Sequence, residues 1–396
     1  MAYAELMSFS LTALVLDGFL NRETELKLLV KSLSDPKTRF GFTVVGKRRV
    51  GKTALLHRVK LNLEKRQLPC VYISVWDLTD QTLEEWSLKL SELIFEAYRP
   101  FVSIKQKLKE LAQTPLSLLR QVLPKLSVDF KLAEFISTSF ALESRSKLSD
   151  DQQLERPFEL LEVLAKATRK PLVLIIDEFP DLVNVKKSQG HLIGTAVIKK
   201  LRTIYERQHS LRLCVSGSIR RTMEIYCLDA SSAFYRQLAP LEVKPLADKY
   251  IVQLYKKNRI KLADDGLKRL IEYVQGIPFY AQFLGRQIQQ KQFKRSLRAA
   301  DIDALVADFI AQEGNLLFRE EFYKLSPKEK KLVLALCSQK QFSVTGIDKT
   351  INEHSSTVAK LLQSLQEKAA LERLDKGVYE FTDPFFQLWL QGLAAT

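Results

Sequence analysis

Short runs of consecutive apolar residues alternate with stretches of helical apolar spacing through the first 245 residues. Five such runs, rich in β-branched residues, occur at positions 40–45, 69–76, 171–178, 211–218 and 238–243. Continuous apolar runs of this length are typical of strands buried on both faces of a parallel sheet, with helices as the crossover connections. The pattern predicts an α/β domain over residues 1–245, built on a parallel five-stranded sheet.

The hydrophobic pattern changes after residue 245. From 246 to 312 it is helical, with one break at Gly276-Ile277-Pro278, which predicts a domain of packed helices. Residues 101–150 are also mostly helical in pattern and predict an insertion into the α/β domain, although residues 127–132 alternate like a hairpin arm.

The last segment, residues 313–396, has the element order of a winged helix-turn-helix domain. Apolar spacing predicts helices at 327–338, 346–352 and 355–371, and alternation at 378–381 predicts a strand. The hydroxyl side chains of Ser355-Ser356-Thr357 are expected to cap the third helix.

One glycine-rich stretch gives the chain its candidate chemistry. Gly46-Lys47-Arg48-Arg49-Val50-Gly51-Lys52-Thr53 has the spacing G-x-x-x-x-G-K-[ST] of a phosphate-binding P-loop, between a predicted strand and a predicted helix. In that setting backbone N–H groups and the helix N-terminus bind phosphate. Lys52 is expected to reach the β- and γ-phosphates and Thr53 to hold Mg²⁺, while Arg48 and Arg49 add positive charge at the mouth. The sequence therefore predicts binding of ATP with Mg²⁺.

Two carboxylates, Asp177 and Glu178, end the third predicted strand. Open α/β sheets bind ligands at the carboxyl ends of their strands, so this pair is expected near the P-loop. Asp177 fits the role of holding Mg²⁺, directly or through water, and Glu178 fits a group that polarises an attacking water. At the end of the fourth strand, Ser216 or Ser218 could contact the γ-phosphate or that water. We take Ser216 as the candidate, although small polar residues also end strands for reasons of turn geometry.

The net charge of +15 indicates nucleic acid or another acidic surface as a partner. Residues 251–312 hold 11 Lys and Arg against 6 Asp and Glu, whereas residues 313–396 hold 11 of each. Because phosphate binding needs surplus basic side chains, the better candidate surface for DNA lies on a helix of the helical domain. A solvated helix face would have the same composition. The basic residues of this helix are Lys291, Lys294, Arg295 and Arg298.

No apolar run approaches the length of a membrane span, and no basic segment precedes the apolar patch near the N-terminus, so we expect a cytoplasmic protein. The four cysteines are widely spaced, and the four histidines form no ligand-spaced cluster. We therefore expect reduced thiols and no dedicated zinc site.

With these motifs in hand, the chain resembles archaeal-type ATPases of the STAND class, near AAA+ proteins and archaeal replication initiators. The resemblance covers most of residues 18–390. Three markers are specific in combination: Phe19-Leu20-Asn21-Arg22-Glu23-x-Glu25-Leu26 ahead of the P-loop, the P-loop itself, and Leu174-Ile175-Ile176-Asp177-Glu178-Phe179. Further markers are Val215-Ser216-Gly217-Ser218, Tyr235-Arg236, Gly276-Ile277-Pro278-Phe279-Tyr280 and Asp383-Pro384-Phe385-Phe386.

The resemblance implies a nucleotide-binding α/β domain, a helical lid over residues 246–312 and a winged helix over 313–396. It also implies that Asn21, Arg22 and Ala54 contribute to the nucleotide site, although Asn21 is by pattern alone a helix N-cap. Pro278 is expected over the nucleotide, so that the lid senses ATP or ADP; a simple break between packed helices would leave the same signal. Arg236 matches an arginine finger serving a neighbouring subunit, where a surface charge is the alternative.

We therefore expect a slowly hydrolysing regulatory ATPase whose nucleotide state sets the arrangement of lid and winged helix. Expected partners are a protein bound through the winged helix and further copies of the chain in a nucleotide-dependent homo-oligomer, with no membrane. The lack of a clear AAA+ lid arginine, with Arg286 only a loose candidate, favours a switch over a ring motor. The alternative is an ATP-dependent DNA-binding or DNA-loading protein. A P-loop small-molecule kinase is less favoured, because an adjacent Asp-Glu pair suits water activation.

Overall fold

The computed structural model describes residues 9, 21–37, 41–101, 149–187, 189–218, 223–343, 347 and 353–395. Apart from its ends, the insertion predicted at 101–150, with its hairpin arm, lies outside these described residues, as does most of the helix predicted at 346–352. Within the described ranges, no helix is both long enough and apolar enough to cross a membrane.

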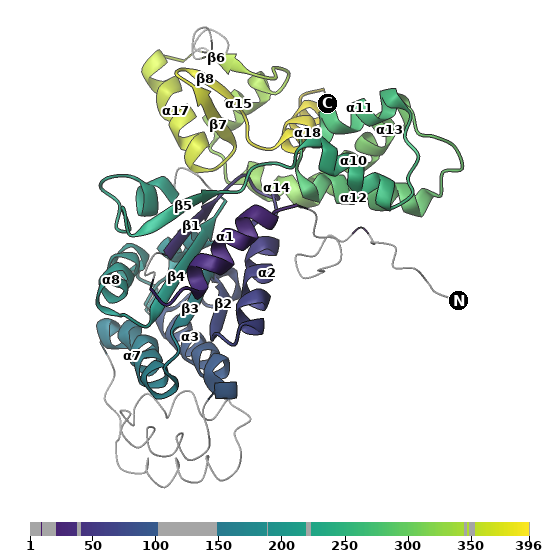
Figure 1. Ribbon diagram of the computed structural model, residues 1–396. Helices are drawn as coiled ribbons and strands as arrows, with labels where there is room; N and C mark the ends of the chain where they lie inside the picture. The colour runs from purple at the N-terminus through teal and green to yellow at the C-terminus, as the bar shows by residue number, and fades with distance from the viewer. Residues whose placement is uncertain are drawn as a thin grey trace, which may run out of the picture.

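The amino-terminal part of the chain forms the predicted parallel sheet (Figure 1). Its strands follow the order β2-β3-β4-β1-β5, and every neighbouring pair is parallel. The strands are β1 (Gly41–Val45), β2 (Cys70–Ser74), β3 (Leu172–Asp177), β4 (Leu211–Gly217) and β5 (Leu238–Glu242). The prediction of an α/β domain with a parallel five-stranded sheet is confirmed.

Helices cover both faces of this sheet, because successive residues of a strand point to opposite faces. Val44 packs in the core under α1 (Glu23–Ser34) and α2 (Lys52–Lys65), whereas Val45 packs in the core on the other face. That second core is closed by α3 (Leu83–Tyr98), α7 (Asp150–Thr168) and α8 (Gly194–Arg207). Short 3₁₀ or π-helical segments are η2 (Val75–Asp77), η3 (Arg99–Phe101), η5 (Phe179–Asn184) and η6 (Glu224–Leu228).

The carboxyl-terminal part of the chain stands at one end of the large sheet (Figure 1). Its first helices are α10 (Asp248–Lys257), α11 (Asp264–Val274), α12 (Pro278–Lys291) and α13 (Ala299–Phe309), followed by the π-helical segment η7 (Ile310–Gly314) and α14 (Asn315–Tyr323). Then come α15 (Pro327–Leu336), α17 (Ser355–Glu367) and α18 (Pro384–Ala395). An antiparallel sheet in the order β6-β8-β7 contains β6 (Phe342–Ser343), β7 (Leu371–Asp375) and β8 (Val378–Phe381).

One hydrophobic core holds this part together. Tyr280 of α12 stacks on Phe385 of α18 with ring centroids 3.9 Å apart, and Phe309 of α13 packs edge-on against both rings. The boundary predicted between residues 312 and 313 falls within η7, and the core extends across it. The described residues of 246–395 therefore pack as one body, called here the carboxyl-terminal unit.

Two predicted helix caps are wrong. The N-cap of α1 is Arg22, in the left-handed region with φ 89°, and not Asn21. The N-cap of α17 is His354, whose carbonyl already accepts from the N–H groups of Thr357 and Val358. The hydroxyl residues expected to cap this helix are thus its first helical residues, because the backbone bonds begin one residue earlier.

Candidate active site

The carboxyl edge of the large sheet brings the predicted site residues together. The P-loop follows β1, Asp177 ends β3, and Ser216 lies near the end of β4, which separates β1 from β3. Because the strands are parallel, all three segments meet at the same edge. Motifs more than 120 residues apart in the sequence thus share one site, as the spacing of Thr53 and Asp177 illustrates.

The P-loop backbone is shaped by its two glycines. Gly51 is the N-cap of α2 with φ 95°, a conformation that residues with a side chain rarely adopt. At Gly46 a Cβ atom would come within 2.5 Å of the Val243 carbonyl oxygen. Inside the loop, Lys52 Nζ donates to the carbonyl oxygens of Gly46 and Lys47, each at 3.0 Å. Burial lowers the pKa of Lys52 to about 8, because the ammonium loses hydration inside the loop. A phosphate bound in the loop would stabilise the charged form of this side chain.

Asp177 is almost fully buried and accepts hydrogen bonds on both carboxylate oxygens. Thr53 Oγ1 and Tyr72 Oη each donate to Oδ2 at 2.7 Å. Ser216 Oγ donates to Oδ1, and the Glu178 N–H donates to the same oxygen at 3.1 Å. Tyr72 was not among the predicted site residues; its signal in the sequence is the polar tip of a phenol within a mostly apolar strand.

The donor set beside the P-loop suits a hard divalent cation. The Thr53 hydroxyl and the Asp177 carboxylate lie within hydrogen-bond distance of one another at the phosphate loop. Mg²⁺ prefers oxygen ligands and is usually held by one or two protein groups together with phosphate oxygens. The residues present therefore fit a Mg²⁺ ion brought in with a nucleotide.

Glu178 lies beside this pair in a constrained backbone. Its φ of 51° is in the left-handed region, where a residue with a side chain is strained, and such strain is frequent at functional sites. Burial, and secondly the charge of Asp177, raise the pKa of its carboxyl group. Ser218 Oγ donates to Glu178 Oε1 at 3.1 Å. The serine that touches the candidate base is thus Ser218, whereas Ser216, fully buried inside β4, holds Asp177.

Arg22 braces the P-loop from outside the phosphate site. Its guanidinium donates to the carbonyl oxygens of Val50 at 3.3 Å and Lys244 at 2.5 Å, and it also pairs with Glu25. These bonds join the loop to the segment after β5. Asn21 precedes this brace, and Ala54 lies in the first turn of α2.

The three consecutive basic side chains of the P-loop all pair with acidic residues of the carboxyl-terminal unit. The P-loop ion pairs, as we call them, are Lys47 with Glu372 and Glu380, Arg48 with Glu321, and Arg49 with Asp383 and Glu321. Arg48 and Arg49 therefore point to carboxylates more than 270 residues away in the sequence, and not to the mouth where they were expected.

Arg49 is the centre of this contact. Its Nη1 donates to Asp383 Oδ2 at 2.6 Å, and its guanidinium carbon lies 5.6 Å from the Phe279 ring centroid and 5.3 Å from that of Phe318. Tyr280 Oη donates to the same Asp383 carboxylate at 2.6 Å. Pro278 is the first residue of α12, the helix that carries Phe279 and Tyr280, whereas Phe318 belongs to α14. The Arg49 side chain of the P-loop thus contacts the first turn of the helix that Pro278 begins.

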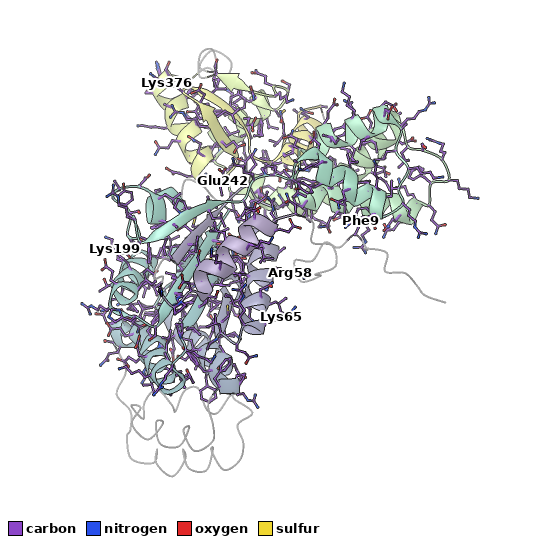
Figure 2. The ribbon with its side chains drawn as sticks, viewed as in Figure 1. Phe9, Arg58, Lys65, Lys199, Glu242 and Lys376 are labelled. Atoms are coloured by element: carbon purple, nitrogen blue, oxygen red, sulfur yellow. The ribbon has the colours of Figure 1, made fainter. Side chains whose placement is uncertain are left out.

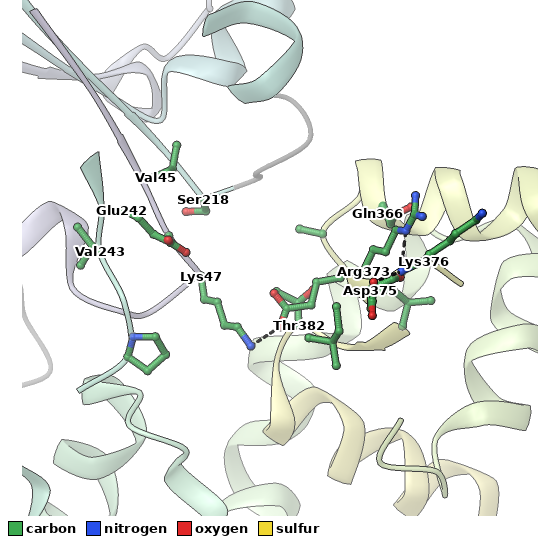
Figure 3. Close-up of a pocket in the computed structure, with 16 residues that line it drawn as sticks. Val45, Lys47, Ser218, Glu242, Val243, Gln366, Arg373, Asp375, Lys376 and Thr382 are labelled. Atoms are coloured by element: carbon green, nitrogen blue, oxygen red, sulfur yellow. Dashed lines mark hydrogen bonds and ion pairs between the residues drawn. The ribbon is translucent and has the colours of Figure 1, made fainter. Parts of the chain in front are cut away.

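A cleft of about 560 Å³ separates the P-loop from the β7–β8 hairpin. Gly46, Lys47 and Ser218 line one side, and residues of β7 with Thr382 line the other. Figure 3 shows Lys47 pointing across this cleft towards the hairpin. The cleft opens beside the serine that contacts Glu178, so it gives the site an entrance between the two parts of the chain.

Arg236 lies far from this site within the chain. It precedes β5, and the Gly41–Leu238 pairing places it at the amino edge of the sheet. The strand length separates it from the P-loop by roughly 15 Å. It takes a φ of 60° and stacks its guanidinium over its exposed neighbour Tyr235 at 5.3 Å. A catalytic contact of Arg236 with its own P-loop is excluded by this placement.

The basic helix predicted for DNA binding does not form. Helix α12 ends at Lys291, because Gln292 takes a left-handed φ of 48°. The other three basic residues, Lys294, Arg295 and Arg298, therefore lie in the connection to α13. Lys291 also pairs with Asp308 at 2.5 Å, and Arg295 with Asp301 at 2.6 Å. Half of the expected charge is thus neutralised within the chain.

The fold and site define the class of protein. A P-loop beside an Asp-Glu pair, on a parallel sheet, is the architecture of a P-loop ATPase. A family model described as an ATPase domain predominantly from Archaea matches residues 19–282, more than half of the chain. The protein belongs to this family. Among curated proteins, none matches the sequence.

Solved structures share the fold. A Walker-type ATPase of Pyrococcus abyssi superposes with a TM-score of 0.64 at 19% identity, and the match covers 94% of this chain and 96% of that one. The ORC2 protein of Aeropyrum pernix, solved in ADPNP–ADP complexes, gives a TM-score of 0.51 at 11% identity and covers 96% of each chain. At these identities the similarity is one of fold.

Proposed function

We propose that this P-loop ATPase is a regulatory switch of the STAND class, in which ATP binding and slow hydrolysis set the position of the carboxyl-terminal unit. Residues 246–312 act as its lid and residues 313–396 as its winged helix. The observation that carries this proposal is the set of P-loop ion pairs, which links the phosphate site directly to the rest of the molecule.

The chemical roles follow from the geometry of the site. The P-loop N–H groups and Lys52 Nζ bind the β- and γ-phosphates. Thr53 and Asp177 hold Mg²⁺, which neutralises phosphate charge when bound. Glu178, fixed through Oε1 by Ser218, accepts a hydrogen bond from the attacking water and orients it. The raised pKa of Glu178 makes it a stronger base than an ordinary carboxylate.

Nucleotide binding and docking of the carboxyl-terminal unit compete for the same cations. Phosphates in the loop bring negative charge close to Lys47, Arg48 and Arg49, which in the structure are paired with carboxylates. At short range in a partly buried setting such charges interact strongly. A ligand shifts a conformational equilibrium by its differential affinity for the two states, and this competition supplies the difference.

The two segments of the carboxyl-terminal unit are expected to move together when nucleotide binds. Its lid and winged-helix segments share one core, and Asp383 is at once the partner of Arg49, the acceptor for Tyr280 and the acceptor for the N–H of Phe385 in α18. A change at Arg49 is therefore transmitted to both segments through Asp383, without the need for a hinge at residue 312.

Weakening one P-loop ion pair is expected to raise the rate of nucleotide association and the turnover at low ATP. Glu321 of α14 pairs with Arg48 and Arg49, so Glu321→Gln should release the carboxyl-terminal unit more easily. Because docking competes with nucleotide, loss of a charged hydrogen bond of about 1.5 kcal/mol corresponds to an increase of up to about tenfold in the rate of nucleotide association, and in steady-state turnover below saturating ATP. Stopped-flow binding of a fluorescent ADP analogue and phosphate production at low ATP measure the two rates.

Glu320→Gln is the matched control, since it removes the neighbouring carboxylate of the same helix, which is exposed and absent from the P-loop ion pairs. Its rates should equal those of the wild type. If Glu321→Gln also leaves both rates unchanged, the ion pairs do not restrain the switch.

Partners are part of the proposal. The placement of Arg236 away from its own site suits an arginine finger supplied to a second copy of the chain, within a nucleotide-dependent homo-oligomer. Light scattering with ADP and with ATP tests this: a monomer in both states removes the finger. The winged helix is proposed as a protein-binding module, because four of the acidic residues in 313–396 pair with the P-loop and the charge of this segment is balanced.

The second candidate function is ATP-dependent DNA binding, and it rests on the net charge of +15. The end of α12 and its connection to α13 form the proposed surface, although two of the four basic residues there, Lys291 and Arg295, are ion-paired. A gel shift at low salt with ATP decides the matter, since absence of binding there eliminates the DNA hypothesis.

A further inference from the structure

Tyr72 reaches the candidate magnesium site from the strand beside Asp177. In the parallel pairing of β2 with β3, Ser74 lies opposite Asp177 and Tyr72 lies two residues earlier. The phenol Oη donates to Asp177 Oδ2 at 2.7 Å, the same distance as that from Thr53 Oγ1 to this oxygen. One carboxylate oxygen is thus shared by a hydroxyl of the P-loop helix and a hydroxyl of the neighbouring strand.

His57 holds the Tyr72 ring in place. The two rings lie with centroids 4.1 Å apart and planes at 33°, so they overlap in a tilted stack. His57 follows Thr53 by four residues in α2, and residues four apart lie on the same helix face. The helix that provides Thr53 therefore also provides the ring that supports Tyr72.

The hydrogen bonds to Asp177 come from three separate elements. Thr53 belongs to α2, Tyr72 to β2 and Ser216 to β4, while the Glu178 N–H is the fourth donor. An ionised carboxylate offers about four lone-pair sites, so these donors leave it little freedom to rotate. Of the four, the Tyr72 bond is the one whose removal leaves the P-loop, the base and the β4 strand chemically intact.

We propose that Tyr72 is a positioning residue for Mg²⁺: it holds the Asp177 carboxylate in the orientation that binds the ion, directly or through water. The inference rests on the proposed function, because it assigns Asp177 to the ion that accompanies ATP. Partners that hydrogen-bond a metal-binding side chain fix its direction, and their loss typically costs about 10–100-fold in metal affinity. Tyr72 itself touches neither nucleotide nor ion.

Tyr72→Phe tests the proposal, since it removes the hydroxyl and keeps the ring on His57. The full-length protein is mixed with a fluorescent ADP analogue and titrated with Mg²⁺, and binding is also measured in EDTA. The Mg²⁺ concentration at half-maximal effect should rise about tenfold, while affinity in EDTA stays that of the wild type. A merely structural role would weaken binding in EDTA as well.

Tyr98→Phe is the matched control in the same domain. It removes a buried phenol bond of similar length, to the Lys170 carbonyl oxygen at 2.8 Å, away from Asp177. Its Mg²⁺ midpoint should not change. His57→Ala, which keeps the hydroxyl but removes the stacked ring, should shift the midpoint in the same direction as Tyr72→Phe by a smaller factor, and it tests the proposal independently of how well Tyr72→Phe folds.

Three results would overturn the inference. The first is an unchanged Mg²⁺ midpoint in both Tyr72→Phe and His57→Ala. The second is a lower midpoint, which would mean that the phenol competes with the ion. The third is a loss of nucleotide affinity that is equal with and without Mg²⁺. Failure of the proposed function is a different result, because wild-type protein would then bind no nucleotide, or would bind it without any response to Mg²⁺.

Discussion

Replacing Glu178 by glutamine is expected to slow ATP hydrolysis by about 10²–10⁴-fold, the range found when a general base is removed. Glutamine keeps the size of the side chain and an oxygen that can accept from Ser218, but it cannot take a proton from water. Nucleotide affinity should stay within about twofold, since Glu178 contributes no phosphate ligand. Phosphate release and binding of a fluorescent nucleotide measure the two quantities.

Asp181→Asn is the control for this experiment. Asp181 lies three residues further along, in η5, and its carboxylate accepts from the exposed Trp76 indole instead of facing the P-loop. Its removal should leave turnover close to that of the wild type. Full turnover in Glu178→Gln would show that the attacking water is activated by another group.

Lys52→Ala is expected to weaken nucleotide binding by at least about 100-fold, which is about 2.7 kcal/mol. Lys52 is 5% exposed, and its ammonium donates to two carbonyl oxygens of the loop, so it is in position to meet incoming phosphate oxygens. Hydrogen bonds to charged groups contribute about 1.5–3 kcal/mol each. Titration of a fluorescent ADP analogue, followed by thermal unfolding with and without ADP, measures the loss.

Lys47→Ala provides the comparison within the same loop. Lys47 is also a lysine of the P-loop, but its Nζ faces Glu372 and Glu380 across the cleft. Its replacement should leave binding within a few-fold of the wild type or strengthen it. Near-normal binding in Lys52→Ala, or equal losses in the two variants, would contradict the assignment of Lys52 to the phosphates.

Local sequence signals were enough to predict the catalytic edge of the sheet. The strand that ends in Asp177 is a continuous apolar run, and such a run has one plausible place, buried between two helical layers. The P-loop spacing then places Thr53 at the first turn of the following helix. In a parallel sheet the carboxyl ends of the strands lie at one edge, so the sequence alone predicts that Thr53 and Asp177 lie close together.

The long-range contacts of the same loop were beyond local signals. No periodicity links Arg48 to Glu321 or Arg49 to Asp383, since these pairs depend on how two bodies dock.

The end of α12 was missed for a different reason. Gln292 takes a left-handed conformation usually signalled by Gly or Asn, so the basic stretch after it looked like a continuing helix.

The choice between Ser216 and Ser218 shows a further limit. Both hydroxyls lie near the end of β4, and only the structure reveals that Ser216 is inside the strand and fully buried. Tyr72 was overlooked because tyrosine is common in strands, and its contact with Asp177 depends on the β2–β3 register.

In the proposed switch, nucleotide state sets the position of the carboxyl-terminal unit relative to the α/β domain. Lys65 in α2 and Lys376 in the turn between β7 and β8 are exposed and lie on the two bodies (Figure 2), while all four native cysteines are buried. Spin labels on Lys65→Cys and Lys376→Cys therefore report the distance between the bodies by double electron–electron resonance.

This measurement is made in the Glu178→Gln background, so that ATP persists. Without nucleotide we expect one distance distribution, which corresponds to the docked P-loop ion pairs. With ATP and Mg²⁺ we expect a shifted distribution. Glu321→Gln without nucleotide should reproduce part of that shift. Identical distributions without nucleotide, with ADP and with ATP would contradict the claim that this ATPase is a switch.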